Sequence, residues 1–206
     1  MNTLKLEAIH LAIAGRTLLE ITTEVTACNI LTVMGPSGSG KSSLLAYLAG
    51  FLAPAFNASG KVWLNEQCLS DLPAERRQLG LLFQDPLLFP HMSVGDNLRF
   101  ALPAATPDKQ SVIAASLEAV GLAGFADRDP ATLSGGQKSR VALQRVLLSN
   151  PRAVLLDEPF AKLDAPLRRE LREQVFSILR EAGLPTVLVT HDAEDATAAA
   201  GPIIQL

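Results

Sequence analysis

The chain has 206 residues, of which 48% are hydrophobic and 19% charged, so it can bury a core of its own and is not intrinsically disordered. Its 18 basic and 21 acidic residues give a formal net charge of −3, which provides no general attraction for nucleic acid. Its two cysteines, Cys28 and Cys68, form neither a metal-ligand spacing nor a disulfide framework. The uncharged stretch 42–60 contains Pro54 and several polar residues, so we expect no membrane span there.

Four short apolar runs set the layout of the chain, at residues 30–34, 79–83, 153–156 and 186–190. Runs of this kind are typical of strands that are buried on both faces. Helical patterns separate them, at residues 42–52, 140–148 and 166–182. Strands that alternate with helices predict an α/β fold with a mostly parallel sheet and helices on both of its faces.

Two further regions differ from this pattern. Looser alternation at residues 4–11 and 60–64 predicts an antiparallel β flank. Residues 86–150 lack a strong strand pattern but contain helical ones, such as 111–120. We therefore expect one domain over 1–206, with a core formed by 1–85 and 151–206 and a helical insertion at 86–150.

Each apolar run leads directly into a residue type that chemistry uses. The four residues that follow the runs are Gly35, Gln84, Asp157 and His191. Because ligands of open parallel sheets bind at the carboxyl ends of the strands, we expect these four sites to meet at one edge of the sheet.

The first run opens into a segment with the spacing of a phosphate-binding loop. Its residues are Gly35, Pro36, Ser37, Gly38, Ser39, Gly40, Lys41 and Ser42, and Ser43 follows. Glycines let successive backbone N–H groups point inward as an anion cradle, and the helix that begins there adds its positive end. Lys41 could reach the β- and γ-phosphates and Ser42 could hold Mg²⁺, which predicts a phosphate-loop NTPase core.

The third run ends in two neighbouring acids, Asp157 and Glu158. Carboxylates at the end of a buried strand are costly unless they have a partner. Asp157 could hold Mg²⁺, and Glu158 could act as the general base toward water. The structural alternative is an acidic strand end that caps a helix.

A second phosphate-binding device is predicted by the residues Ser134, Gly135, Gly136 and Gln137. Ser134 and Gln137 have the spacing of a capping box at the start of a helix, which explains part of the segment. Two glycines in a first helical turn are unfavourable for capping alone, and they suit a site where something approaches the backbone closely.

These motifs, in this order, resemble the nucleotide-binding subunits of ABC transporters over nearly the whole chain. Residues 35–42 look like the Walker A loop, 153–158 like Walker B, and 133–137 read LSGGQ, the ABC signature. Taken alone, Gln84 and His191 are more typical of a surface glutamine and a structural histidine. In this family they match the Q-loop glutamine and the H-loop histidine, and 161–164 resembles the D-loop.

The resemblance implies a mechanism and partners. Two copies would sandwich two ATP molecules, with Ser134, Gly136 and Gln137 of one copy contacting the nucleotide on the other. Ser42, Gln84 and Asp157 would organise Mg²⁺ and water, Glu158 would be the base, and His191 would contact the γ-phosphate. Hydrolysis would drive a membrane permease, with a solute-binding protein as a further partner and no nucleic acid.

The segment 83–94 resembles the ATPases of bacterial importers for sulfate, polyamines, iron and thiamine. This implies a peripheral protein at the cytoplasmic face of the bacterial inner membrane, with residues 87–92 at the permease. The alternative for 87–92 is an apolar loop packed on the helical insertion. For the whole chain, an ABC exporter ATPase or a soluble, non-transport ABC ATPase are the alternatives.

The chain departs from the family pattern at the D-loop, where Ala161 stands in place of the common serine, and at the expected adenine contact. The family stacks adenine on an aromatic residue upstream of Walker A, and residues 11–16 contain none. We therefore expect adenine to be held in another way.

Overall fold

The computed structural model describes residues 2–163 and 165–206, so Asp164 of the D-loop segment lies outside the described residues. Two compact units divide the chain. The first comprises the described parts of Met1–Leu81, Arg152–Glu158 and Arg172–Leu206, and the second comprises Leu82–Pro151 and the described part of Pro159–Leu171. In chain order the elements are β1 (Thr3–Ile13), β2 (Arg16–Thr26), β3 (Ile30–Met34), α1 (Lys41–Ala49), β4 (Phe56–Leu64), β5 (Gln67–Cys68), η1 (Ala74–Arg76), β6 (Leu79–Leu82), α2 (Val94–Ala101), α3 (Lys109–Glu118), η2 (Pro130–Thr132), α4 (Gly135–Leu148), β7 (Ala153–Asp157), α5 (Ala165–Glu181), β8 (Thr186–Thr190), α6 (Ala193–Ala199) and β9 (Ile203–Gln205).

Two sheets form the framework of the first unit. One is antiparallel, with the strand order β2-β1-β4-β5. The other has the order β6-β7-β8-β3-β9, in which β3 runs parallel to β8 and β9, and β7 runs parallel to β8. The predicted α/β fold with a parallel sheet and an antiparallel flank is therefore confirmed.

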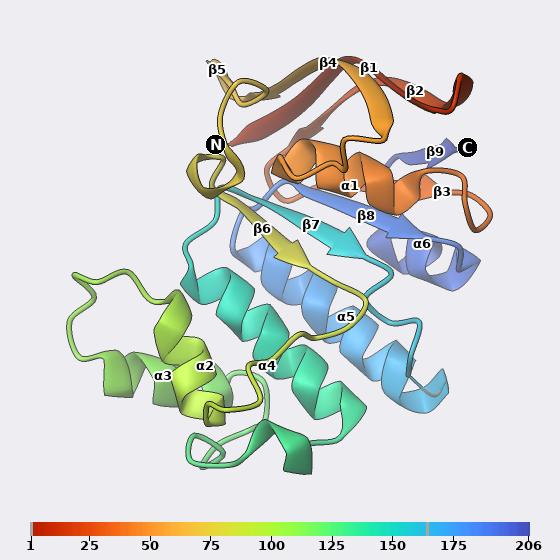
Figure 1. The fold of residues 1–206 in the computed structure, drawn as a ribbon. Coiled ribbons are helices and arrows are strands. Elements are labelled where there is room, and N and C mark those ends of the chain that lie inside the picture. Colours follow the sequence, from red (N-terminus) through yellow and green to blue (C-terminus); the bar gives the residue numbers. More distant parts are fainter. Residues whose placement is uncertain (1, 164) are drawn as a thin grey trace. The chain divides into compact units, whose positions relative to one another are not determined.

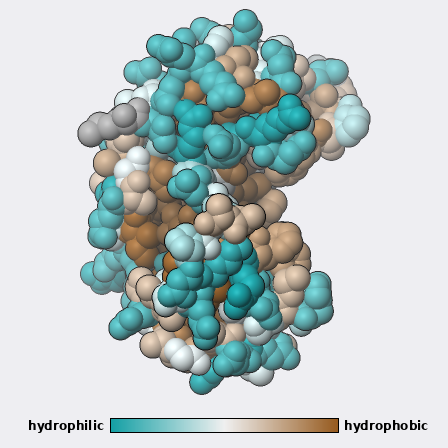
Figure 2. Space-filling view, turned by 90° about the vertical axis from the view of Figure 1, so that its left-hand side faces the viewer, coloured by the Kyte–Doolittle hydropathy of each residue, from teal (hydrophilic) through white to brown (hydrophobic). Residues whose placement is uncertain are grey.

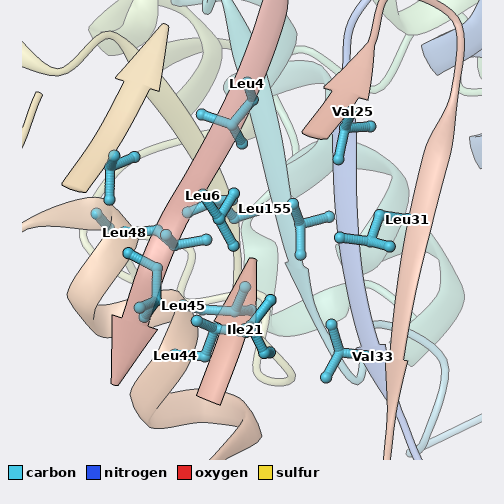
Figure 3. Packing of buried hydrophobic residues seen from close by; sticks show 14 of the residues in the cluster. Leu4, Leu6, Ile21, Val25, Leu31, Val33, Leu44, Leu45, Leu48 and Leu155 are labelled. Atoms are coloured by element: carbon cyan, nitrogen blue, oxygen red, sulfur yellow. The ribbon is translucent and has the colours of Figure 1, made fainter. Parts of the chain in front are cut away.

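Helix α1 lies between the antiparallel sheet and the parallel sheet, and α6 lies on the opposite face of the parallel sheet (Figure 1). The core of the unit is built around α1. Leu44, Leu45 and Leu48 of this helix are at most 1% exposed, and they pack with leucine, isoleucine and valine side chains of both sheets (Figure 3). Burial of a leucine side chain contributes about 1.5–3 kcal/mol, so this apolar layer fixes the helix that follows the phosphate-binding loop.

The second unit contains α2, α3 and α4, which lie in the chain between β6 and β7. All three helices lie within residues 86–150, where the sequence predicted helices. Helix α2 begins at a Ser93 cap, and its first turn packs so closely on residue 126 that a Cβ atom on Gly95 would lie 3.1 Å from the Ala126 carbonyl oxygen. Leu98, Ile113 and Leu117, from α2 and α3, are buried here.

Several boundaries differ from those that the sequence predicted. The helix expected over 42–52 ends at Ala49, because Gly50 adopts a left-handed φ of 91° and caps it. The helix expected over 140–148 already begins at Gly135. The strand expected over 79–83 ends at Leu82. Strands β2 and β9 were not predicted at all.

The surface carries mixed polarity. In the face drawn in Figure 2, hydrophilic side chains cover much of the molecule and hydrophobic ones occur in patches between them. Among the described residues, none of the helices has both the length and the apolar character needed to cross a bilayer.

A buried arginine fixes the carboxyl end of α1. The Arg77 side chain donates to the carbonyl oxygens of Tyr47 and Leu48 at 2.8 Å, of Leu72 at 2.9 Å and of Ser70 at 3.0 Å. Desolvation lowers the pKa of Arg77, and the negative end of the helix dipole offsets part of that cost. A Cβ atom on Gly50 would lie 2.6 Å from the Arg77 Nε atom, so glycine leaves room for this cap.

We expect Arg77→Met to lower the free energy of unfolding by about 2–4 kcal/mol, because four carbonyl groups, one buried and three partly buried, lose their donor. Arg76→Met is the matched control, since Arg76 is exposed, and it should change stability by less than about 0.5 kcal/mol. Urea unfolding followed by circular dichroism measures both. Equal stability of the two variants would contradict the capping role.

Candidate functional site

Three strand ends of the first unit meet as predicted. Asp157 ends β7, Glu158 follows it, and His191 follows β8, while the loop after β3 leads into Lys41 at the start of α1. The Ser42 hydroxyl donates to Asp157 Oδ1 at 2.9 Å, and Lys41 Nζ lies 3.7 Å from Glu158 Oε1. His191 Nδ1 lies 3.0 Å from Glu158 Oε2. Segments more than one hundred residues apart in sequence therefore form one polar cluster.

The loop before α1 has the geometry of an anion cradle. Gly38 and Gly40 have φ angles of 81° and 92°, which favour glycine. The loop ends at the amino terminus of α1, where free N–H groups and the helix dipole attract negative charge. A Cβ atom on Gly40 would approach Leu18 to 3.1 Å, so β2 packs directly against this turn.

The Lys41 ammonium group lies inside this loop. The residue is 5% exposed, and its Nζ atom donates to the carbonyl oxygens of Gly35 at 2.8 Å and Pro36 at 2.9 Å. A buried cation is stable only with acceptors around it, and the Glu158 carboxylate adds an opposite charge. The arrangement places one positive charge at the position where a phosphate group would enter the loop.

The Asp157 carboxylate is partly buried, and burial disfavours its charged form. Desolvation raises its pKa most, the nearby Glu158 charge raises it further, and the hydrogen bond from Ser42 and the charge of Lys41 oppose this rise. A serine hydroxyl and a carboxylate oxygen are the hard oxygen ligands that Mg²⁺ takes. The described residues contain no group of three or more His, Cys, Asp or Glu side chains placed for a metal, so such an ion would also need oxygen atoms from a nucleotide or water.

Glu158 combines an unusual backbone with two charged neighbours. Its φ angle of 42° is rare for a residue with a side chain, and its backbone N–H donates to the Val189 carbonyl oxygen at 3.0 Å. Strain of this kind costs about 1–3 kcal/mol and is concentrated at functional sites. The conformation holds the carboxylate between the Lys41 ammonium group and the His191 ring.

The second unit contains the other predicted phosphate device. Ser134 caps α4, its side chain accepts from the Gln137 N–H at 3.3 Å, and the Gln137 side chain accepts from the Ser134 N–H at 3.0 Å. The capping box is therefore present. Gly136 is buried, and a Cβ atom there would lie 2.7 Å from Leu167, whereas Gly135 is exposed. Packing against Leu167 is a sufficient reason for a glycine at position 136. The exposed Gly135 leaves the amino terminus of α4 accessible.

Gln84 follows β6 and belongs to the second unit, so its approach to Lys41 and Asp157 stays a prediction. Its neighbour Asp85 forms an ion pair with Lys162 of the D-loop segment, within the same unit. The residues of the two predicted loops are thus linked by charge.

Two functional candidates were missed by sequence reasoning. Asn97 is fully buried, accepts from the Phe89 N–H at 2.8 Å and donates to the carbonyl oxygens of Phe89 and Ser93 at 3.1 Å and 2.9 Å. Arg145 of α4 donates to the Leu87 carbonyl oxygen at 2.9 Å. Both residues hold the segment after Gln84 through backbone groups, for which the sequence carries no local signal.

Comparison with known proteins decides the family. The sequence profile of the family described as "ABC transporter" matches residues 18–161, which is more than half of the chain. The chain belongs to the ABC transporter ATP-binding family. It is therefore an ABC-type ATPase domain, and ATP is its nucleotide.

Similar proteins agree with this assignment. The ABC ATP-binding protein YnjD of Escherichia coli, itself uncharacterised, is 49% identical over 89% of this chain and 86% of its own length. The Fe(3+) ions import ATP-binding protein FbpC of Pseudomonas fluorescens is 44% identical over 95% of this chain. The chain spans 56% of the length of that relative.

A solved structure has the same fold. The ATP-binding cassette MJ0796, in a dimeric post-hydrolysis state bound to ADP and Pi, matches with a TM-score of 0.79 and 28% identity. The match covers 98% of this chain and 94% of MJ0796. This ABC cassette thus shares the fold of MJ0796 over nearly its whole length.

The raised pKa of Asp157 leads to a testable prediction about this ABC cassette. A carboxyl whose pKa is higher in the folded state than in the unfolded state stabilises the fold below its unfolded pKa, and this stabilisation is lost as pH rises through the folded pKa. At neutral pH the ionised Asp157 therefore costs stability, and Asp157→Asn should raise the melting temperature of the nucleotide-free protein.

If Asp157 holds Mg²⁺ as the sequence predicts, the same variant should lower the turnover of ATP by at least about 100-fold, because an amide is a poorer ligand for that ion than a carboxylate. Thermal melts at pH 7 and a phosphate-release assay measure the two effects. A lower melting temperature together with normal turnover would contradict both the electrostatic account and the proposed role of Asp157.

Proposed function

We propose that this ABC cassette is the energy-coupling subunit of a bacterial solute importer, acting as a homodimer at the cytoplasmic face of the cell membrane. The ATPase part of the proposal rests on the cluster of Lys41, Ser42, Asp157, Glu158 and His191 at one edge of the parallel sheet. Its partners would be permease subunits and a solute-binding protein.

Each residue of the cluster has a role that fits its contacts. The loop amides and Lys41 would bind the phosphates of ATP, with Lys41 exchanging its carbonyl acceptors for phosphate oxygens. Ser42, Asp157 and Gln84 would hold Mg²⁺, which neutralises phosphate charge when bound. Glu158 would accept a proton from the attacking water, and His191 would contact the γ-phosphate.

In the proposed dimer, the amino terminus of α4 would serve as the second phosphate-binding site. Ser134, with the exposed Gly135 beside it, caps an accessible helix terminus that would bind the ATP held by the partner copy. A nucleotide held by two copies would tie dimerisation to hydrolysis. The dimeric state of MJ0796 with ADP and Pi supports this arrangement.

The permease would dock on the segment after Gln84. Leu87 is 56% exposed and has a φ angle of 46°, and Phe100 of α2 is 66% exposed. The Phe100 ring packs edge-on against Phe89 at 5.0 Å between centroids. Arg145 and Asn97 hold this loop in place with an apolar side chain facing outward. The similarity to FbpC of Pseudomonas fluorescens, an Fe(3+) ions import ATP-binding protein, supports a solute importer.

Glu158→Gln tests the proposed general base. The amide keeps the shape of the side chain but cannot take a proton, so turnover should fall by at least about 100-fold while ATP binding persists. Glu118→Gln, on the exposed end of α3, is the control and should hydrolyse ATP normally. A phosphate-release assay and nucleotide binding on filters measure the two quantities. Turnover of Glu158→Gln close to that of the wild type would contradict the role of Glu158 as general base.

Leu87→Ser tests the docking segment. Wild-type protein purified in mild detergent from its own cell membranes should retain a multi-span permease in stoichiometric amount, and Leu87→Ser should lose most of it. Ile203→Ser is the control, because Ile203 is 52% exposed but lies on β9. Recovery of the wild type without any membrane protein would reject the transporter proposal. Equal retention by Leu87→Ser would reject only the docking site.

A further inference from the structure

We propose that Thr190 is a positioning residue for His191, and that a buried ion pair between Arg172 and Asp195 anchors it. The inference rests on the proposed role of His191 at the γ-phosphate. It concerns three buried residues, Thr190, Arg172 and Asp195, that lie outside the segments resembling the family's motifs.

The Thr190 hydroxyl links the backbone on the far side of His191 to helix α6. Thr190 is the last residue of β8 and is 1% exposed. Its Oγ1 atom accepts from the Asp192 N–H at 3.0 Å and donates to Asp195 Oδ2 at 2.9 Å. One side chain thus joins the residues on both sides of His191 and ties them to α6.

Asp195, which accepts from the Thr190 hydroxyl, forms a buried ion pair with Arg172. Asp195 is 3% exposed and Arg172 of α5 is 5% exposed, and Arg172 Nε lies 2.8 Å from Asp195 Oδ1. A buried ion pair adds little net stability relative to an apolar pair, but it holds its groups in one geometry. Arg172 also reaches Glu194 Oε2 at 3.3 Å, and that carboxylate side chain is 79% exposed. The two acids therefore differ in burial and in their link to Thr190.

The His191 ring needs such support because it lies at the surface. Its side chain is 57% exposed, and Nδ1 contacts Glu158 at 3.0 Å. Few packed neighbours can aim an exposed ring, so its direction depends on the backbone at 190–192. A displacement of about 1 Å at a catalytic group can cost about 100-fold in rate. The hydroxyl of Thr190 acts on the reaction through this backbone and touches no substrate.

The matched variants are Thr190→Val and Thr190→Ser. Valine keeps the branched shape of threonine in the buried strand but removes the hydroxyl, whereas serine keeps the hydroxyl. We expect the kcat of Thr190→Val for ATP to fall about 10- to 50-fold with KM within about twofold, and Thr190→Ser to stay within about threefold of the wild type. Glu194→Gln should behave as the wild type, because it leaves the Asp195 link intact.

A double-mutant cycle separates positioning from general structure. If Thr190 acts through His191, then Thr190→Val added to His191→Ala should cause no further loss of kcat. Asp195→Asn is a second route if Thr190→Val fails to fold, since asparagine keeps the shape but loses the charge opposite Arg172. Its kcat should fall in the same direction.

Three outcomes would overturn the inference. One is normal kcat in Thr190→Val while the kcat of His191→Ala is strongly reduced, which leaves the proposed function intact. The second is multiplication of the two losses in the double mutant. The third is an equal loss in Thr190→Val and Thr190→Ser. Normal turnover in His191→Ala would instead reject the role proposed for His191 itself.

Discussion

The buried ammonium group of Lys41 is the constraint on which the site depends. A cation that is 5% exposed must be surrounded by acceptors, and here they are the carbonyl oxygens of Gly35 and Pro36 and the carboxylate of Glu158. These acceptors come from the loop after β3 and from the end of β7, so the parallel order of the strands is needed to bring them together. The apolar layer around α1 then holds the helix that carries this lysine in place.

The site carries costs that a purely structural region would avoid. Asp157 has a raised pKa because burial disfavours its charge, and Glu158 has a left-handed backbone conformation. Natural proteins accept such local costs where function needs them, and stability comes from elsewhere. In this chain it comes from the leucine-rich core and from caps such as Arg77. The polar groups of the site therefore do not have to contribute to the stability of the fold.

Sequence patterns predicted the elements that are apolar throughout, and they predicted the residues that follow them. The apolar run 186–190 has the same first and last residues as β8, and His191 follows it as expected. Strand β2 was not recognised, although Leu19, Ile21 and Val25 face the core in alternation, because polar residues on its outer face dilute the signal. The α1 terminus was placed too late, since Leu52 continues the apolar pattern beyond the glycine that ends the helix.

The contacts that could not be predicted are those made to backbone atoms or between distant polar side chains. Arg77 donates to carbonyl oxygens, and no residue type marks such an acceptor in a sequence. Arg172 and Asp195 are separated by a strand and a turn, and charged residues at such positions are usually solvated. The nucleotide contact expected of Gly136 stays a prediction, and the contact that the sequence did not reveal is with Leu167, 2.7 Å from a Cβ atom on Gly136.

The central claim is that two copies complete each other's ATP sites, and a mixing experiment tests it most directly. Lys41→Ala should disable the phosphate loop, and Ser134→Arg should block the helix terminus offered to the partner, so each variant alone should be inactive. In a mixed dimer one of the two sites is intact, so an equal mixture should recover about a quarter of the wild-type ATPase activity. Normal activity of Ser134→Arg alone, or no recovery although tagged chains show that mixed dimers have formed, would contradict the account.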